Sequence, residues 1–199
     1  WLRYPLHVHV TVPENGRVVF ADERVTVTAL ALKHRIVCTG FLFTESPALR
    51  SLRRETLPLI PHFKRQAVKQ GEDLVLPDGT RYPNMDLTLD PPPQRRYAYC
   101  SDTAYEPALA PFIQGVELLY HEATFTEQLR ARATETMHST AAQAARLALE
   151  AGVGRLLLGH FSSRYKSADE LLAEARPIFP DTLLSTEGAT YTVDQRSIV

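Results

Sequence analysis

Four residues whose side chains can bind a metal or transfer a proton stand beside the ends of expected strands. Asp102, His121 and His160 each follow a short, mostly apolar run, and His34 precedes one. Binding and catalytic groups gather at strand ends in open α/β sheets. A carboxylate with several imidazoles is a typical zinc ligand set. A single histidine after a strand is more often structural, so the spacing alone leaves a metal site and a structural role equally open.

The elements that would position these residues alternate between strands and helices in the C-terminal half. Ser139 or Thr140 is a suitable N-cap for one helix, and Gly152 suits the C-terminal end of that helix. Strands alternating with helices indicate an α/β (α+β) fold in which helices cover a sheet. Strands are expected at 96–101, 116–121, 156–159 and 190–193, and helices at 107–113, 139–151 and 168–178.

The N-terminal part has the period-two alternation that is typical of half-buried strands. We expect strands at 4–12, 17–32 and 35–44, and the second can be interrupted at Asp22-Glu23. Asn15-Gly16 predicts a hairpin turn between the first two. His7 and His9 would lie on one face of the first strand, where we expect a structural role.

Residues 45–95 differ in composition from the rest, because they hold eight of the fourteen prolines. We expect an excursion with one or two short helices and not a core element. A solvated surface is the ordinary interpretation of the basic residues in this segment. They are Arg50, Arg53, Arg54, Lys64, Arg65 and Lys69.

The whole chain has the composition of an ordinary globular protein, with 199 residues, 44% hydrophobic residues and a net charge of -1. One domain is expected. No apolar run reaches the roughly 18–20 residues of a membrane span, and no leader pattern is visible, so we expect a cytoplasmic protein.

Cys38 and Cys100 lie in apolar runs and are expected to be buried thiols. The net charge does not favour nucleic-acid binding unless the basic residues cluster.

Short motifs around the candidate residues carry more information than their spacing. The series resembles ribonuclease Z of the metallo-β-lactamase superfamily, in the expected order and over practically the whole chain. The H-E-A-T and H-S-T loops together are specific to this family within the superfamily. The motifs are Leu32-Lys33-His34, Ser101-Asp102-Thr103, His121-Glu122-Ala123-Thr124, His138-Ser139-Thr140 and the run from His160 to Tyr165.

The resemblance implies a role for each matched position and two zinc ions per complete active site. His34 would bind the first zinc, Asp102 would bridge both, and His160 would bind the second. His138 would handle a proton near the scissile phosphate, and Glu122 would position it. A bridging ligand should be a carboxylate, because its two oxygens can serve two metals. His121 is expected to be structural.

The activity implied by the resemblance is removal of the 3′ trailer of precursor tRNA by a zinc-dependent endoribonuclease, through two-metal hydroxide attack that leaves a 3′-hydroxyl on the tRNA. Segment 45–95 falls where the family carries a protruding tRNA-binding arm, whose basic cluster would contact phosphates. Arg164 could hold a phosphate or form a surface ion pair, and both remain open. A homodimer is expected by resemblance.

The family's His-x-His-x-Asp-His motif does not occur in this sequence. We therefore expect residues 1–199 to be a partial metallo-β-lactamase-like domain, mainly the C-terminal half of an αββα sandwich. The N-terminal half would come from the same or a partner chain. Two alternatives remain: another phosphodiesterase or arylsulfatase of this fold, or a non-catalytic RNA-binding half.

Overall fold

A computed structural model describes residues 4–194, which divide into two compact units. The larger unit comprises the described residues of Trp1–Glu45 and Arg95–Val199, and the smaller unit comprises Ser46–Gln94. The chain of the larger unit thus leaves its sheet after Glu45 and returns at Arg95. No helix of residues 4–194 is long and apolar enough to cross a membrane.

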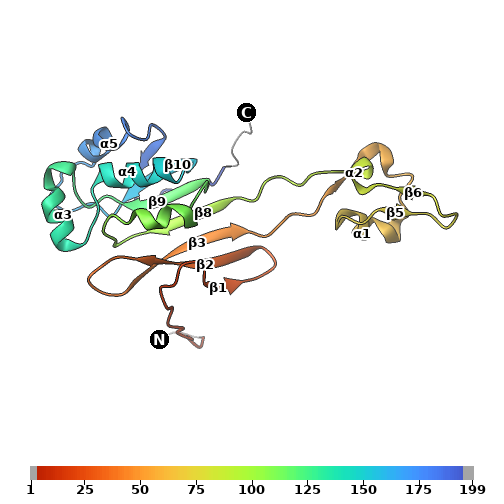
Figure 1. Ribbon diagram of the computed structural model, residues 1–199, viewed down its shortest axis with the longest axis horizontal. Helices are drawn as coiled ribbons and strands as arrows, with labels where there is room; N and C mark the ends of the chain where they lie inside the picture. The colour runs from red at the N-terminus through yellow and green to blue at the C-terminus, as the bar shows by residue number, and fades with distance from the viewer. Residues whose placement is uncertain (1–3, 195–199) are drawn as a thin grey trace. The chain divides into compact units, whose positions relative to one another are not determined.

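The larger unit is built on a mixed seven-stranded sheet (Figure 1). The first four strands in its spatial order pair antiparallel, and the last four, counted from β8, pair parallel. The carboxyl ends of β8, β9 and β10 therefore meet at one edge. In spatial order the strands are β1 (Val18–Ala21), β2 (Val25–Leu32), β3 (Cys38–Glu45), β8 (Arg96–Cys100), β9 (Leu118–Glu122), β10 (Arg155–Gly159) and β11 (Thr182–Leu184).

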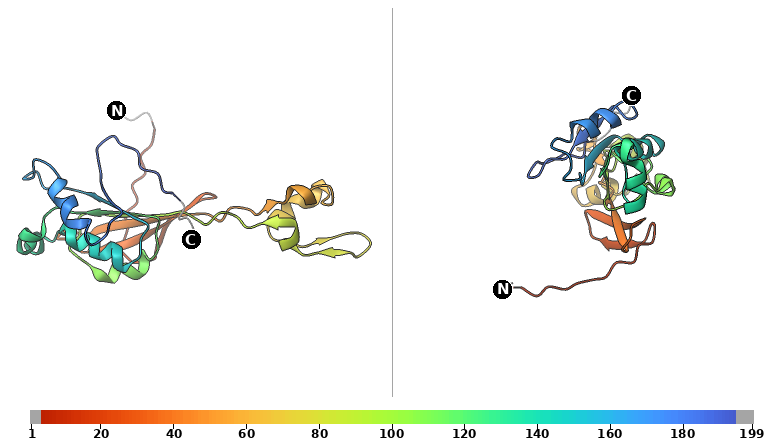
Figure 2. Two further views of the ribbon diagram at one scale, coloured as in Figure 1. Left: turned by 90° about the horizontal axis from the view of Figure 1, so that it is seen from above. Right: turned by 90° about the vertical axis from the view of Figure 1, so that its left-hand side faces the viewer.

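Helices cover one face of this sheet (Figure 2). The helix α4 (Ala141–Glu150) packs on β9, β10 and α5 (Asp169–Ala175), and the 3-10 helix η3 (Pro107–Phe112) packs on β2 and α4. The buried residues of α4 are five alanines, Leu147 and Gln143, and the small alanines let its backbone approach the sheet closely. Full burial of a leucine such as Leu119, Leu156 or Leu158 contributes about 1.5–3 kcal/mol. This core fixes the strand ends that carry the candidate site.

The opposite face of the sheet is aromatic. Phe43 stacks on Tyr97 with ring centroids 5.6 Å apart, and Tyr99 stacks on Tyr120 at 4.8 Å. These side chains share one face because they lie opposite each other in the strand register and alternate along each strand. Burial raises the pKa of Tyr97.

Two short helices connect β9 to α4 beside the site. The 3-10 helix η4 (Glu127–Leu129) leads into α3 (Arg130–Thr136), and α4 follows after a short loop. Thr140 caps α4, because its hydroxyl accepts the Gln143 N–H and the Gln143 side chain accepts the Thr140 N–H. Thr140 is therefore the N-cap of the two candidates, and Gly152 takes the positive φ expected at the helix end.

The smaller unit has its own small core of Ile60, Val68, Leu74 and Leu87. The buried Asn84 amide donates to the carbonyls of Val68 and Glu72 and fixes the loops around this core. Its elements are β4 (Ser51–Leu52), η1 (Arg54–Thr56), η2 (His62–Lys64), α1 (Arg65–Lys69), β5 (Leu74–Val75), β6 (Arg81–Tyr82), α2 (Asn84–Leu87) and β7 (Thr88–Leu89).

Two strand predictions, at 4–12 and 190–193, are wrong, because no strand forms there. Residues 5–12 have no regular secondary structure, and Leu6, Val8 and Val10 are exposed. Alternation alone does not form a strand, since a strand needs a hydrogen-bonding partner. Asn15-Gly16 still forms a turn, but no strand precedes it. Residues 190–193 are also irregular, and the last strand of the described chain is β11.

Two other elements differ in detail from the expectation. Residues 107–112 form a 3-10 helix. The expected strand at 17–32 is a hairpin of β1 and β2, and the break lies at the anticipated position, where the Asp22 carboxylate accepts the N–H groups of Arg24 and Val25. Cys38 and Cys100 are free thiols, of which Cys100 is buried and Cys38 half-buried. Burial raises the pKa of Cys100 to about 12.

Candidate metal centre

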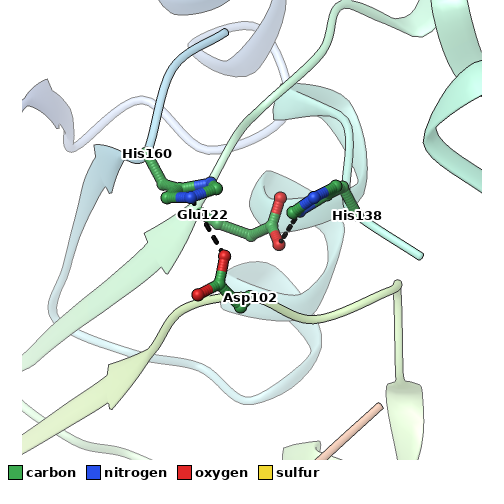
Figure 3. A group of neighbouring side chains, drawn as sticks. All are labelled: Asp102, Glu122, His138 and His160. Carbon is green, nitrogen blue, oxygen red and sulfur yellow. Dashed lines mark hydrogen bonds and ion pairs between the residues drawn. The ribbon is translucent and has the colours of Figure 1, made fainter. Parts of the chain in front are cut away.

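Four of the predicted residues meet at the carboxyl edge of the parallel strands (Figure 3). Asp102, Glu122, His138 and His160 bring one ligand atom each to within 4.8 Å of one another. Asp102 follows β8, Glu122 ends β9, and His160 follows β10, while His138 lies in the loop before α4. The parallel register of β8, β9 and β10 is what brings these three strand ends together.

Glu122 is the buried centre of the cluster, with no exposed side-chain surface. Its Oε1 accepts the N–H of Thr103 at 2.6 Å and lies 2.8 Å from His138 Nδ1. Its Oε2 accepts the Thr124 hydroxyl at 2.6 Å and the N–H of Ser139 at 3.0 Å. A buried carboxylate is stable only with such partners. These bonds join the segments that carry Asp102, Glu122 and His138 into one unit.

His138 is oriented by this carboxylate. Because the carboxylate accepts hydrogen bonds, Nδ1 of His138 carries the hydrogen, and Nε2 is presented to the site. The side chain is 14% exposed, so a substrate can reach it. The arrangement is that of a histidine whose position and tautomer are set by a buried acid, which suits proton transfer.

Asp102 and His160 face each other directly. His160 Nε2 lies 2.9 Å from Asp102 Oδ1, and both side chains are about half exposed. The Thr124 hydroxyl lies 2.9 Å from His160 Nδ1 and can accept a hydrogen from it while donating its own to Glu122. The Nε2 lone pair and the carboxylate oxygen would then point at a common position, which is suitable for a cation.

His34 lies beside this group. Its Nδ1 is 2.9 Å from the carbonyl oxygen of Met137, and its ring centroid is 4.8 Å from the ring centroid of His138. A carbonyl can only accept, so Nδ1 carries the hydrogen and Nε2 remains available. Metal-binding histidines usually donate their second N–H to a carbonyl or carboxylate in this way. The structure thus brings all three predicted ligands and the predicted proton-handling pair into one region.

Backbone strain is concentrated at the same place. Among residues 4–194, positive φ outside glycine occurs at Asp102 (59°), Met137 (58°) and His160 (56°). Each such conformation costs on the order of 1–3 kcal/mol and persists where the surroundings enforce it, which is often at functional sites. Two of these residues are predicted ligands, and the third presents its carbonyl to His34. No pattern in the sequence indicates this strain.

Arg164 lies at the edge of the site and has no ion pair with a carboxylate among the described residues. Its Nε donates to the Ser162 hydroxyl at 3.0 Å, and its guanidinium carbon lies 4.9 Å from the centroid of the Phe125 ring. The Phe125 and His138 rings meet edge to face, with their centroids 6.2 Å apart. Thr124 is the last residue of the H-E-A-T motif, and Phe125, which follows it, is a site residue that no motif predicted.

His121, for which a structural role is expected, lies in the interior beside the cluster. It is fully buried, its Nδ1 lies 2.7 Å from the Glu122 carbonyl, and its Nε2 has no partner among the described residues. Burial lowers its pKa. The histidines outside the cluster behave differently, since His7, His9 and His62 are exposed.

The six residues of the predicted basic cluster fall into two groups. Arg50 donates to the Thr88 hydroxyl and pairs with Asp90, and Arg65 donates to two backbone carbonyls. These two guanidinium groups hold the unit together. The remaining four are exposed or half-buried and have no ion pair within the described chain; they are Arg53, Arg54, Lys64 and Lys69.

Comparison with curated proteins finds ribonuclease Z sequences. The chain is 45% identical over 188 residues to ribonuclease Z of Bacteroides fragilis, which covers 94% of this chain and 62% of the relative. It is 44% identical over 194 residues to ribonuclease Z of Parabacteroides distasonis, with 96% and 64% covered. The chain thus spans less than two thirds of the length of these relatives. No family-wide sequence profile matches it.

Comparison with solved structures addresses the fold. The metallo-β-lactamase fold protein YhfI from Bacillus subtilis matches with a TM-score of 0.55 at 20% identity, over 86% of this chain and half of that protein. The short form of human tRNase Z matches with a TM-score of 0.51 at 21% identity, over 89% of this chain and 46% of that protein.

The mixed sheet, its one helical layer and the side chains at its strand ends therefore define part of a metallo-β-lactamase fold. Within that fold, the identity to ribonuclease Z over nearly the whole chain makes this a ribonuclease Z-like segment. The resemblance inferred from the motifs is confirmed.

Proposed function

We propose that the protein containing this segment is a zinc-dependent endoribonuclease that removes the 3′ trailer of precursor tRNA and leaves a 3′-hydroxyl on the tRNA. The observation that carries this proposal is the buried Glu122–His138 pair beside the facing Asp102 and His160. These residues lie in the motifs that resemble ribonuclease Z, and the relatives at 45% identity bear that name.

The donor set fits zinc. Two imidazoles, from His34 and His160, have Nδ1 engaged by a neighbour and Nε2 available, and Asp102 supplies the carboxylate. Zinc prefers imidazole and carboxylate ligands, about four per ion. Three ligands fall short of two complete sites, so further ligands must come from a portion outside this chain. Bound zinc would lower the pKa of a coordinated water and would neutralise negative charge on the phosphate.

The protein's own contribution to bond cleavage is proton transfer by His138. Cleavage that leaves a 3′-hydroxyl requires a proton on the departing 3′-oxygen. His138 can donate it from Nε2, because Glu122 holds Nδ1 and stabilises the positive imidazolium form. General acid catalysis of this kind contributes about 10²–10⁴-fold to a rate.

The smaller unit is proposed to hold the tRNA body. Four of its basic residues, Arg53, Arg54, Lys64 and Lys69, have neither an ion pair nor a side-chain hydrogen bond in the described chain, and they are suitable for sequence-independent phosphate contacts. Arg50 and Arg65 would support the unit instead. A homodimer, in which the smaller unit of one subunit serves the other, belongs to the same proposal.

The test compares two substrates with the complete protein and zinc. We expect endonucleolytic cleavage of a precursor tRNA at the trailer junction, and slower hydrolysis of bis(p-nitrophenyl) phosphate. Hydrolysis of the small ester without binding or cleavage of precursor tRNA would indicate a different phosphodiesterase and contradict the proposal. Binding of tRNA with no cleavage of either substrate would indicate a non-catalytic RNA-binding protein.

A further inference from the structure

Arg164 lies on the surface, and both its loop and its side chain have defined contacts. The loop that carries it is fixed at both ends, since the Ser162 N–H donates to the Thr124 carbonyl at 3.3 Å and the Tyr165 hydroxyl accepts the Thr126 N–H at 2.9 Å. The Arg164 side chain has two contacts: its Nε donates to the Ser162 hydroxyl, and its guanidinium carbon lies over the Phe125 ring, 4.9 Å from the centroid. An arginine fixed in this way loses little further freedom when it binds a ligand.

The ring under Arg164 is fixed to the proton-donor loop. The Phe125 N–H donates to the Ser139 carbonyl at 3.3 Å, and the Phe125 carbonyl accepts the Ala141 N–H at 2.9 Å. Phe125 is 4% exposed, and its ring touches the edge of His138. The Phe125 ring therefore lies between the Arg164 guanidinium, 4.9 Å from its centroid, and the imidazole of His138, whose centroid is 6.2 Å away.

The outer face of this guanidinium is available. Arg164 is exposed, and no carboxylate neutralises it among residues 4–194. The Arg164 guanidinium lies over the Phe125 ring, and its solvent side is open to a second planar group. Nucleobases stack on arginine planes and aromatic rings in this way when they are not base-paired.

We propose that Arg164, supported by Phe125, stacks on the base of the nucleotide whose 3′-oxygen leaves in the cleavage. The position follows from chemistry, because His138 would protonate that oxygen and Phe125 touches His138. This inference rests on the proposed function and adds a contact for one unpaired base next to the scissile phosphate. A phosphate contact by Arg164 is the competing role.

A cycle of protein and RNA changes separates stacking from a phosphate contact. The complete protein and its Arg164→Lys variant are each given a precursor tRNA with either the normal base or an abasic ribose at that nucleotide, and kcat/KM is measured. Lysine keeps the charge and loses the plane. Arg155→Lys is the matched control, because Arg155 begins β10 at the end of the strand away from the site.

Stacking predicts that Arg164→Lys lowers kcat/KM about tenfold on the normal substrate and less than about twofold on the abasic one. The small loss on the abasic substrate also shows that the variant is folded, and Arg155→Lys should change neither. Equal losses on both substrates, or no loss on either, would overturn the inference and leave the proposed function intact. Failure of the unaltered protein to cleave precursor tRNA would remove the proposed function, and the inference with it.

Discussion

Glu122 is the residue on which the arrangement of the site depends most directly. It binds Thr103, Thr124, His138 and Ser139 at once. A change at Glu122 therefore affects both the position of His138 and the loops around it. His138 has a narrower role, since its imidazole is held by one carboxylate bond and faces the site.

Replacement of Glu122 by Gln keeps the size of the side chain and removes its charge. We expect kcat for precursor tRNA to fall by about 10²-fold or more, because the imidazolium form of His138 loses its counter-charge. Glutamine also leaves Oε1 or Nε2 mismatched with one of the donors, so thermal unfolding is measured in parallel. Unchanged kcat in a folded Glu122→Gln protein would contradict this role.

The Thr124 hydroxyl is expected to orient His160 for metal binding, because it lies 2.9 Å from Nδ1. Thr124→Val removes the hydroxyl at nearly constant volume and should weaken zinc binding by roughly 10–100-fold. Thr124→Ser retains the hydroxyl and serves as the control. Zinc affinity is measured by competition with a chelator, and equal affinity in the valine variant would argue against this orientation.

His121 makes stability depend on pH. Burial lowers its pKa in the folded state, so the folded protein favours the neutral ring and the unfolded chain takes up a proton first as the pH falls. The stability it contributes is present above the unfolded pKa of about 6.5 and is lost as the pH falls below it, at up to about 1.4 kcal/mol per pH unit. His121→Leu should reduce the loss of unfolding free energy between pH 7.5 and 5.5. An identical pH dependence in the variant would show that His121 is not responsible.

At the scale of elements, the helix α4 fixes the loop that carries His138. The loop runs directly into Thr140, whose reciprocal bonds with Gln143 start the helix. Thr140→Ala should lower the free energy of unfolding by about 1 kcal/mol, whereas Thr140→Ser should retain most of it. Chemical denaturation measures both. Equal stability of the alanine and serine variants would show that the cap is not important here.

The sequence predicts those elements whose signal is local. Apolar runs predicted β8, β9 and β10, and capping residues predicted α4, so the placement of Asp102, His121 and His160 near strand ends could be foreseen. Residues 4–12 have the same alternation as a strand, but strand formation depends on a partner that the pattern does not specify. The positive φ of Asp102 and His160 depends on tertiary contacts. So does the stacking of Arg164 on Phe125.

At the scale of the whole molecule, the chain covers about 62% of the length of its relatives. The described sheet has helices on one face and aromatic side chains, including Phe43, Tyr97 and Tyr120, on the other. In the two-sheet sandwich of this fold, a second sheet would cover such a face. We expect the part of the protein that would supply this second sheet to supply the remaining metal ligands as well.

The zinc content of residues 1–199 tests whether the ligand set in this chain is incomplete. The chain of residues 1–199, purified with zinc and then dialysed, should hold fewer than two zinc ions, because three ligands cannot saturate two four-coordinate sites. The complete protein is the control and should hold two. Two tightly bound zinc ions in the 199-residue chain would contradict the proposed ligand set.

We expect His138 to transfer a proton during metal-dependent cleavage of precursor tRNA. Single-turnover cleavage by the complete protein is compared with that of its His138→Ala variant, with zinc content measured on both. We predict a rate loss of about 10²–10⁴-fold at unchanged zinc content and unchanged tRNA binding. Cleavage by the variant at the rate of the unaltered protein, or a loss explained by lost zinc, would contradict the account.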